Sequence, residues 1–187
     1  MIDWKVVESI NDKSDGSSED KKIEPLEAVE IKDIKANKEK YTAKGVEAIK
    51  NGKVAAVLLA GGQGTRLGLD KPKGTLNVGV NKDLFLFGQL IRNLLDVVDM
   101  TGAYVPLYIM TSDKNNEDTV AFFEEHNYFG YDKDYGKFFI QSMVPSVDYN
   151  GKLYMESTDS LAMSPNGNGG WFLSLMAAGL DKDMEEK

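Results

Sequence analysis

Short apolar runs alternate with stretches of helical periodicity along most of the chain. The runs at 54–60 (VAAVLLA) and 105–111 (VPLYIMT) are continuous and flanked by turn residues, which is typical of strands buried on both faces of a sheet. Residues 138–141 form a third, shorter run of the same kind. The pattern therefore predicts three buried strands.

The segments between and beside these runs have the spacing of helices. Apolar residues recur every three or four positions in 83–98, and the same reading predicts helices at 38–51, 115–126 and 171–184. Asn115 or Asn116 can cap the helix predicted at 115–126. Strand and helix in alternation predict an α/β fold, a doubly wound and mostly parallel sheet of the Rossmann type.

Three loops are expected to share one edge of this sheet, because right-handed crossovers bring the carboxyl ends of parallel strands together. The first loop follows Ala60, the second contains Gln141, and the third spans residues 164–170. Ligands of such sheets bind outside the carboxyl ends of the strands. This edge is the predicted binding site.

The remaining segments are polar or short. Residues 11–22 predict a solvated segment, 26–35 have spaced apolar positions and predict partial order, and 149–152 (YNGK) is a hairpin turn signal.

Composition removes several classes of chemistry. The 187 residues contain no cysteine and one histidine, and the formal net charge is −8. Thiolate catalysis, disulfides and cysteine zinc sites are excluded, and an acidic chain has no general attraction for nucleic acid or an anionic membrane. His126 is expected on the surface. The sequence shows no leader and no apolar run of about 18 residues, and it predicts a cytoplasmic protein.

The loop after the first strand carries the strongest chemical signal. Residues 59–74 read LAGGQGTRLGLDKPKG, and three of the four positions from 61 to 64 are glycine. Such a backbone can approach a ligand closely and cradle phosphate with its amides. Arg66 adds a fork of donors for phosphate oxygens, and Lys73 adds a second positive charge.

The two best-known phosphate motifs do not fit this loop. A dinucleotide-binding fingerprint needs a glycine three positions after Gly64, where the chain has Leu67, and no Gly-Lys-Ser/Thr ending of a P-loop is present. A dinucleotide-binding domain, which would bind NAD, is therefore disfavoured.

The loop instead resembles the signature of the UDP-sugar pyrophosphorylases, most closely the UDP-N-acetylglucosamine pyrophosphorylase branch. Further segments match in the same order: 106–112 (PLYIMTS), 128–130 (YFG), 138–145 (FFIQSMVP) and 163–170 (MSPNGNGG). The resemblance covers about residues 40 to 187. It implies a nucleotide-diphospho-sugar transferase fold of the GT-A-like type, with 38–187 as its nucleotide-binding portion and 1–37 as a partly ordered extension.

The resemblance also implies the site. The nucleotide-binding residues would be Leu59, Ala60, Gly61, Gly62, Gly64, Gln141, Gly167 and Asn168. The segment 59–62 would hold the uridine through its backbone, Gln141 and Gly167 would contact the uracil edge, and Asn168 would contact the ribose or the sugar.

Catalytic roles carry over to two residues. Arg66 would bind the leaving pyrophosphate and Lys73 would stabilise charge around the α-phosphate. The implied reaction joins UTP and a sugar 1-phosphate, releasing pyrophosphate and a UDP-sugar. Mg²⁺ would bridge the phosphates. The aspartate expected to bind it belongs to a later part of the family pattern that is not in this chain, so we name no metal ligand.

The chain departs from the family pattern in two residues and in length. Asn166 stands where an aspartate is usual and Ile140 where a glutamine is common. Family members continue well past this length, so the resemblance implies a truncated, N-terminal part that is weak or inactive alone and either self-associates or needs a C-terminal half. The alternatives are a non-catalytic uridine-nucleotide-binding module or one half of a split enzyme.

Overall fold

The computed structural model describes residues 24–64 and 67–187. The chain divides into two compact units, Glu39–Ser142 with Pro165–Lys187 and Met1–Lys38 with Met143–Ser164. The first, larger unit contains a three-stranded sheet, and the candidate site lies in this unit.

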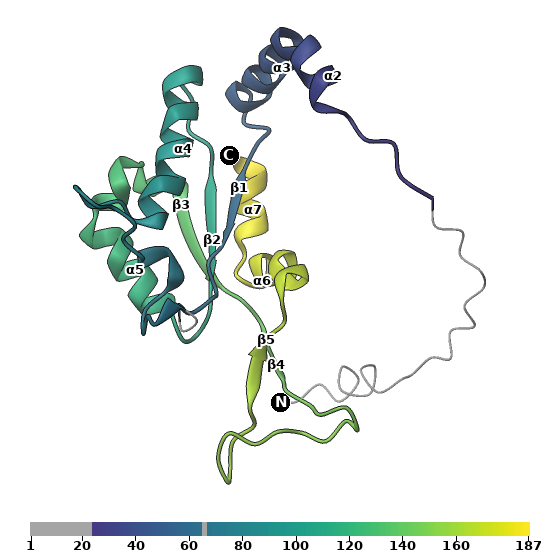
Figure 1. Ribbon diagram of the computed structural model, residues 1–187, viewed down its shortest axis with the longest axis vertical. Coiled ribbons are helices and arrows are strands. Elements are labelled where there is room, and N and C mark those ends of the chain that lie inside the picture. Colours follow the sequence, from purple (N-terminus) through teal and green to yellow (C-terminus); the bar gives the residue numbers. More distant parts are fainter. Residues whose placement is uncertain (1–23, 65–66) are drawn as a thin grey trace. The chain divides into compact units, whose positions relative to one another are not determined.

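The sheet is parallel throughout (Figure 1). Its strands are β1 (Ala56–Leu59), β2 (Leu107–Thr111) and β3 (Gly136–Ile140), in the order β1-β2-β3. Both neighbouring pairs are parallel. The three predicted strands and the parallel α/β class are confirmed.

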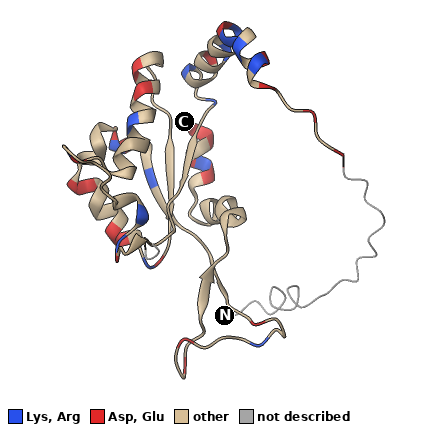
Figure 2. Cartoon of the chain, in the orientation of Figure 1, with Lys and Arg blue, Asp and Glu red and all other residues tan. Residues whose placement is uncertain are grey.

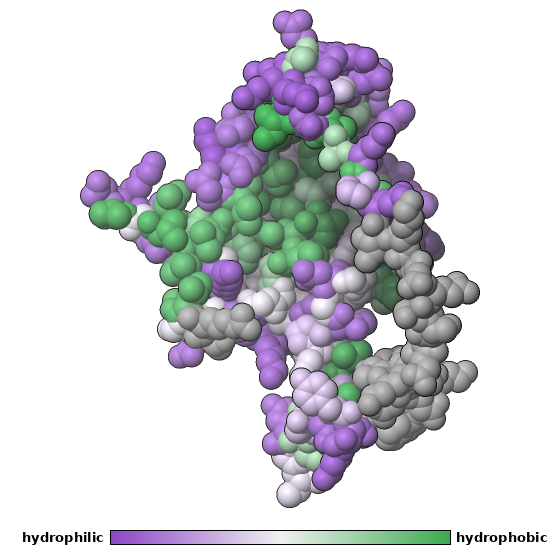
Figure 3. Space-filling view, turned by 45° about the vertical axis from the view of Figure 1, so that its right-hand side comes forward, coloured by the Kyte–Doolittle hydropathy of each residue, from purple (hydrophilic) through white to green (hydrophobic). Residues whose placement is uncertain are grey.

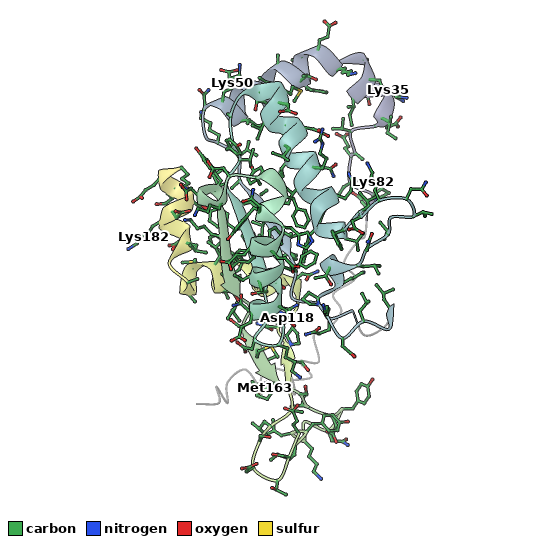
Figure 4. The ribbon with its side chains drawn as sticks, turned by 90° about the vertical axis from the view of Figure 1, so that its left-hand side faces the viewer. Lys35, Lys50, Lys82, Asp118, Met163 and Lys182 are labelled. Atoms are coloured by element: carbon green, nitrogen blue, oxygen red, sulfur yellow. The ribbon has the colours of Figure 1, made fainter. Side chains whose placement is uncertain are left out.

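Helices cover both faces of the sheet. On one face, α4 (Leu86–Thr101) and α5 (Asn116–Glu125) pack against the strands through a cluster that includes Ile91 and Phe123. On the other face lie α6 (Trp171–Ala177) and α7 (Leu180–Glu186), packed through Leu175. Figure 4 shows α5 with Asp118 and α7 with Lys182 on opposite sides of the sheet.

Strand β2 forms the centre of this three-layer core. Leu107 and Ile109 belong to the cluster under α4 and α5, whereas Tyr108 and Met110 belong to the cluster under α6 and α7. This is the alternation that a strand imposes, since successive side chains point to opposite faces. Neither β1 nor β2 carries a charged residue, whereas the helices carry most of the charge around them (Figure 2).

The expectation that both apolar runs are buried on both faces is right for β2 and wrong for β1. All five residues of β2 are buried, but those of β1 are half-buried and Leu59 is 41% exposed. Within the described residues β1 pairs only with β2, so one edge of the strand is open. Exposed apolar side chains such as Leu90 of α4 contribute to the apolar surface of the chain, of which Figure 3 shows one face.

The predicted helix 171–184 is in fact two helices, α6 and α7. Gly179 between them has a φ of 71°, in the left-handed region that glycine enters without steric cost. The apolar spacing continues across this break, which is why the periodicity alone did not reveal it. Helix α4 also begins later than predicted, because Phe85 is extended and bridges Asn77.

The remaining elements follow the sequence reading closely. Helix α3 (Lys38–Lys50) matches its prediction, and α2 (Ile31–Ala36) lies in the segment expected to be partly ordered. In the smaller unit, β4 (Met143–Pro145) pairs with β5 (Met163–Pro165). The predicted turn is present between them, where the amide of Asp148 donates to the carbonyl of Lys152. Short 3-10 helices span Lys73–Thr75, Asn127–Gly130, Lys133–Tyr135 and Asn168–Gly170.

His126, which the sequence places on the surface, is only partly exposed. It is half-buried, stacks on Phe129 with ring centroids 5.1 Å apart, and has Nδ1 2.9 Å from the Phe122 carbonyl. The turn that follows has left-handed φ at three residues in a row, including Tyr128 and Phe129. Such residues cost about 1–2 kcal/mol each, which aromatic packing against Phe123 offsets.

Across 24–64 and 67–187, no helix combines the length and the apolar character needed to cross a membrane.

Candidate functional site

A cleft of about 310 Å³ lies where the three parallel strands end. Leu59 and Met110 come from the ends of β1 and β2, and Gln141 directly follows β3. The full lining is Leu59, Gly61, Gly62, Met110, Gln141, Pro165, Gly167 and Asn168. Strand ends and two loops therefore meet at the predicted edge of the sheet.

The glycine-rich loop after β1 is tied back on itself. Gln63 bridges Pro72, and the amide of Gly64 donates to the carbonyl of Lys71 over 3.0 Å. The amides of Gly61, Gly62 and Gln63 donate to no described residue. Three successive amides beside the cleft are thus available to a ligand, an arrangement that suits anionic or carbonyl oxygens.

Gln141 forms the opposite wall. Its own amide N–H donates to the Thr111 carbonyl over 2.9 Å, so the backbone is fixed to β2. The side chain is 7% exposed, and no described residue bonds to its amide group. Since no described polar side-chain atom is both buried and unpartnered, this amide reaches the open space of the cleft. It offers one donor group and one acceptor to a ligand.

Gly61 lets the two walls meet. A Cβ atom at this position would lie 2.2 Å from Nε2 and 2.8 Å from Cδ of Gln141. No other residue can stand there while Gln141 keeps its position, because real Cβ atoms do not approach so closely. The close approach explains the glycine in physical terms, independently of phosphate binding.

Behind Gln141, hydrogen bonds hold the chain against α6. The amide of Ser142 donates to Oγ of the buried Ser174 over 3.0 Å, and the Ser142 carbonyl accepts from the amide of Asn166 over 3.1 Å. This second bond places the segment that supplies Gly167 and Asn168 beside the end of β3.

The structure brings six of the eight predicted nucleotide-binding residues into this one cleft: Leu59, Gly61, Gly62, Gln141, Gly167 and Asn168. Ala60 and Gly64 stand outside its lining. Ala60 packs on the core under α4 and α5, and Gly64 is buried in the loop.

Of the two predicted catalytic residues, the structure describes Lys73 but not Arg66. Lys73 is exposed and lines a neighbouring cavity of about 230 Å³, which shares Leu59 and Gly62 with the cleft. Its backbone amide lies 3.5 Å from the Gly62 carbonyl, to which it donates. Arg66 lies outside the described residues.

Sequence reasoning missed three residues of the site. Met110 and Pro165 line the cleft, and Asn115 supports it from behind. Asn115 is the N-cap of α5 by position, yet its side chain makes no capping bond and turns toward the glycine-rich loop instead. The available signal was the position of Asn115 in the turn after a buried strand. That position also fits a helix cap, which was the role predicted from the sequence.

The cleft lining contains no carboxylate. In the described part of the chain no group of three or more histidine, aspartate or glutamate side chains could hold a metal ion. Asp113 is exposed, and Glu117 and Asp118 lie in the first turn of α5, where negative charge is stabilised by the helix dipole. The lining residues therefore do not fit a magnesium site of their own.

Comparison with known proteins decides the family. The family model described as "UTP--glucose-1-phosphate uridylyltransferase" matches residues 5–187. The chain belongs to this family. The UDP-N-acetylglucosamine pyrophosphorylase of Saccharomyces cerevisiae is 39% identical over 173 residues, which are 88% of this chain and 36% of that protein. A Schizosaccharomyces pombe protein named a probable UDP-N-acetylglucosamine pyrophosphorylase is 37% identical over 91% of this chain and 38% of its own length.

Solved structures agree with this membership of the uridylyltransferase family. A protein from Entamoeba histolytica matches with a TM-score of 0.76 and 33% identity over 87% of this chain and 42% of its own. The UDP-N-acetylglucosamine pyrophosphorylase of Trypanosoma brucei, solved with an inhibitor, matches with a TM-score of 0.66 and 36% identity over 78% of this chain and 30% of its own. The chain thus spans little more than a third of the length of the curated relatives it matches.

Proposed function

We propose that the cleft binds the uridine nucleotide of a sugar-1-phosphate uridylyltransferase. In this reaction UTP and N-acetylglucosamine 1-phosphate, or a related sugar phosphate, give a UDP-sugar and pyrophosphate. The observation that carries the proposal is that an unpartnered Gln141 amide lines one cleft with Gly61 and Gly62. The backbone amides of these two glycines, like that of the next residue, Gln63, donate to no described residue. The names of the relatives support N-acetylglucosamine as the sugar.

The uracil ring fits the wall formed by Gln141. Its imide edge presents a donor between two acceptors, and a side-chain amide can pair with one donor and one acceptor of such an edge. We assign the uracil edge to Gln141 and to the backbone of Gly167. The backbone of 59–62 would hold the rest of the uridine, and Asn168 would contact the ribose or the sugar.

The phosphates would extend along the loop toward Lys73. Gly61 and Gly62 keep the backbone close enough for amide contacts, while Gly64 closes the loop through its bond to Lys71. Lys73, which lines a neighbouring cavity with Gly62, would stabilise charge on the α-phosphate. Arg66 would bind the pyrophosphate. The sugar phosphate oxygen attacks the α-phosphorus and pyrophosphate leaves roughly in line, so the protein supplies position and charge rather than a nucleophile.

Mg²⁺ belongs to this proposal only as an ion that accompanies UTP. Bound to the phosphates it would neutralise part of their charge. We assign no step to the ion, because the lining residues do not fit it.

Calorimetric titration of the chain with UTP, UDP-N-acetylglucosamine and CTP tests the proposal. We expect both uridine ligands to bind, and CTP to bind at least about tenfold more weakly, because a site built around an imide edge leaves polar groups unpaired with a different base. Equal affinity for UTP and CTP, or no binding of either, would contradict the assignment.

Pyrophosphate release separates the enzymatic proposal from a non-catalytic nucleotide-binding module. The assay contains the chain, UTP, N-acetylglucosamine 1-phosphate and Mg²⁺. Turnover by the chain, or by the chain together with a separately expressed C-terminal segment of a relative, supports the enzyme. Binding without turnover in both mixtures supports the module.

A further inference from the structure

Asn115 connects the two loops that follow β1 and β2. Its side-chain nitrogen Nδ2 donates to the Ala60 carbonyl over 2.9 Å and lies 3.4 Å from the Gly62 carbonyl, to which it also donates. Its oxygen Oδ1 accepts from the amide and the hydroxyl of Ser112 over 2.8 and 2.9 Å. The residue is 1% exposed and does not line the cleft.

The orientation of this amide follows from its partners. Carbonyl oxygens can only accept and a backbone N–H can only donate, so Nδ2 must face the loop and Oδ1 must face Ser112. The alternative orientation would put oxygen against two carbonyl oxygens. Asn115 therefore has one geometry in which all of its bonds are made.

This geometry fixes the direction of two loop amides. In a trans peptide the C=O and the following N–H point in opposite directions. The carbonyls of Ala60 and Gly62 point toward Asn115, so the N–H groups of Gly61 and Gln63 point away from it. These two belong to the three successive amides that donate to no described residue.

We propose that Asn115 is a positioning residue for the nucleotide cleft, holding the amides of Gly61 and Gln63 in the direction in which a ligand oxygen can accept from them. The role rests on the proposed function of the cleft. Asn115 touches no ligand in this scheme and acts only through the glycine-rich loop. A loop of small residues loses much conformational freedom when it is ordered, and a buried amide that orders it beforehand removes that loss from the binding step.

The second tie between the same loops cannot replace it. Nε2 of Gln63 donates to the Lys114 carbonyl over 3.2 Å, but this bond is exposed to solvent. Exposed hydrogen bonds compete with water, whereas the Asn115 side chain that makes the other tie is itself buried. We therefore expect the loop to lose its fixed conformation when the Asn115 amide is removed.

Two variants test the role, with a matched control. Asn115→Ala removes the amide, and Asn115→Asp keeps its shape and the acceptor for Ser112 but cannot donate to the loop. Thr119→Val is the control, because the buried Thr119 hydroxyl donates to the Asn115 carbonyl over 2.7 Å and touches neither the loop nor the cleft. Thermal melts establish a temperature at which each variant is folded.

At that temperature UTP affinity is measured by calorimetry, and the amide signals of Gly61 and Gln63 are followed by nuclear magnetic resonance. We expect each Asn115 variant to bind UTP about tenfold more weakly. This is the loss that follows when only about a tenth of the molecules have the loop conformation that binds the ligand. The Gly61 and Gln63 amide signals of each variant should shift. Thr119→Val should lower the melting temperature and leave affinity and loop amides unchanged.

The outcomes separate this role from the function of the cleft. If a folded Asn115 variant keeps its UTP affinity and its loop amide signals do not shift, the positioning role is wrong, but the proposed function of the cleft is not affected. An equal loss of affinity in Thr119→Val would also overturn the positioning role, because a general loss of stability would then explain the effect. Failure of the unmodified chain to bind UTP would overturn the proposed function and this role with it.

Discussion

The two walls of the cleft are built in opposite ways. The wall after β1 presents backbone amides, and its order depends on Asn115 in a neighbouring turn. The wall after β3 presents the side chain of Gln141, and its backbone is held by β2 and by Ser174 of α6. A backbone wall depends on residues outside itself, whereas a side-chain wall depends first on the identity of one residue. Substitutions that act on both walls, on one, and on neither can test this difference.

Gly61→Ala should have the largest effect on binding, because it acts on both walls at once. The added methyl group would lie 2.2 Å from Nε2 of Gln141, so the amide must leave its position. We expect UTP affinity to fall on the order of a hundredfold, roughly 2.7 kcal/mol, with a much smaller change in stability, since Gly61 does not have a left-handed φ. Calorimetry and a denaturant melt measure the two quantities.

Gly45→Ala is the control for this substitution. Gly45 lies in α3, and a Cβ there would meet nothing within 4 Å. It should leave UTP affinity unchanged and raise stability by up to about 1 kcal/mol, the usual gain of alanine over glycine in a helix. Wild-type affinity in Gly61→Ala would show that the walls do not depend on each other at this contact.

Gln141→Ala should have a smaller effect, because it removes the side-chain group from one wall and leaves the loop in place. The loss of hydrogen bonds to the base should weaken UTP binding about tenfold, roughly 1.4 kcal/mol, and should narrow the preference for UTP over CTP. Titrations with both nucleotides measure this change in selectivity.

Gln89→Ala offers the same substitution on the exposed surface of α4, away from the cleft. It should change neither affinity nor selectivity. If Gln141→Ala still prefers UTP over CTP to the same degree, the Gln141 side chain does not recognise the base.

The same contrast explains what could be predicted from the sequence. Apolar runs and helical spacing predicted the strands, the parallel sheet and the edge at which Gln141 and Gly167 meet the glycine-rich loop, because these follow from periodicity and chain topology. The support for the backbone wall could not be predicted in this way. The bonds from Asn115 to Ala60 and Gly62 span more than 50 positions and depend on the rotamer of one buried side chain. The open edge of β1 and the break at Gly179 were likewise invisible to apolar patterning, which reports burial averaged over an element.

The smallest effect on the cleft is expected from Tyr108→Phe, which acts on neither wall. The hydroxyl of the fully buried Tyr108 donates to Asp183 of α7 over 2.8 Å, on the face of the sheet covered by α6 and α7. Removing this bond should cost about 1 kcal/mol of unfolding free energy. UTP affinity should remain unchanged, and calorimetry at neutral pH measures it.

Tyr108 also makes stability depend on pH. Burial, followed by the hydrogen bond and negative charge of Asp183, raises the pKa of Tyr108 above its usual value of 10.0. The folded chain therefore keeps this proton at pH values where the unfolded chain has lost it, so the contribution is complete below about pH 10 and falls as pH rises further. Denaturant melts between pH 8 and about 11 should show a decline that is shallower in Tyr108→Phe. The decline should not vanish, because burial also raises the pKa of Tyr131. Identical slopes in both chains would mean that Tyr108 loses its proton as easily in the folded state as in the unfolded state.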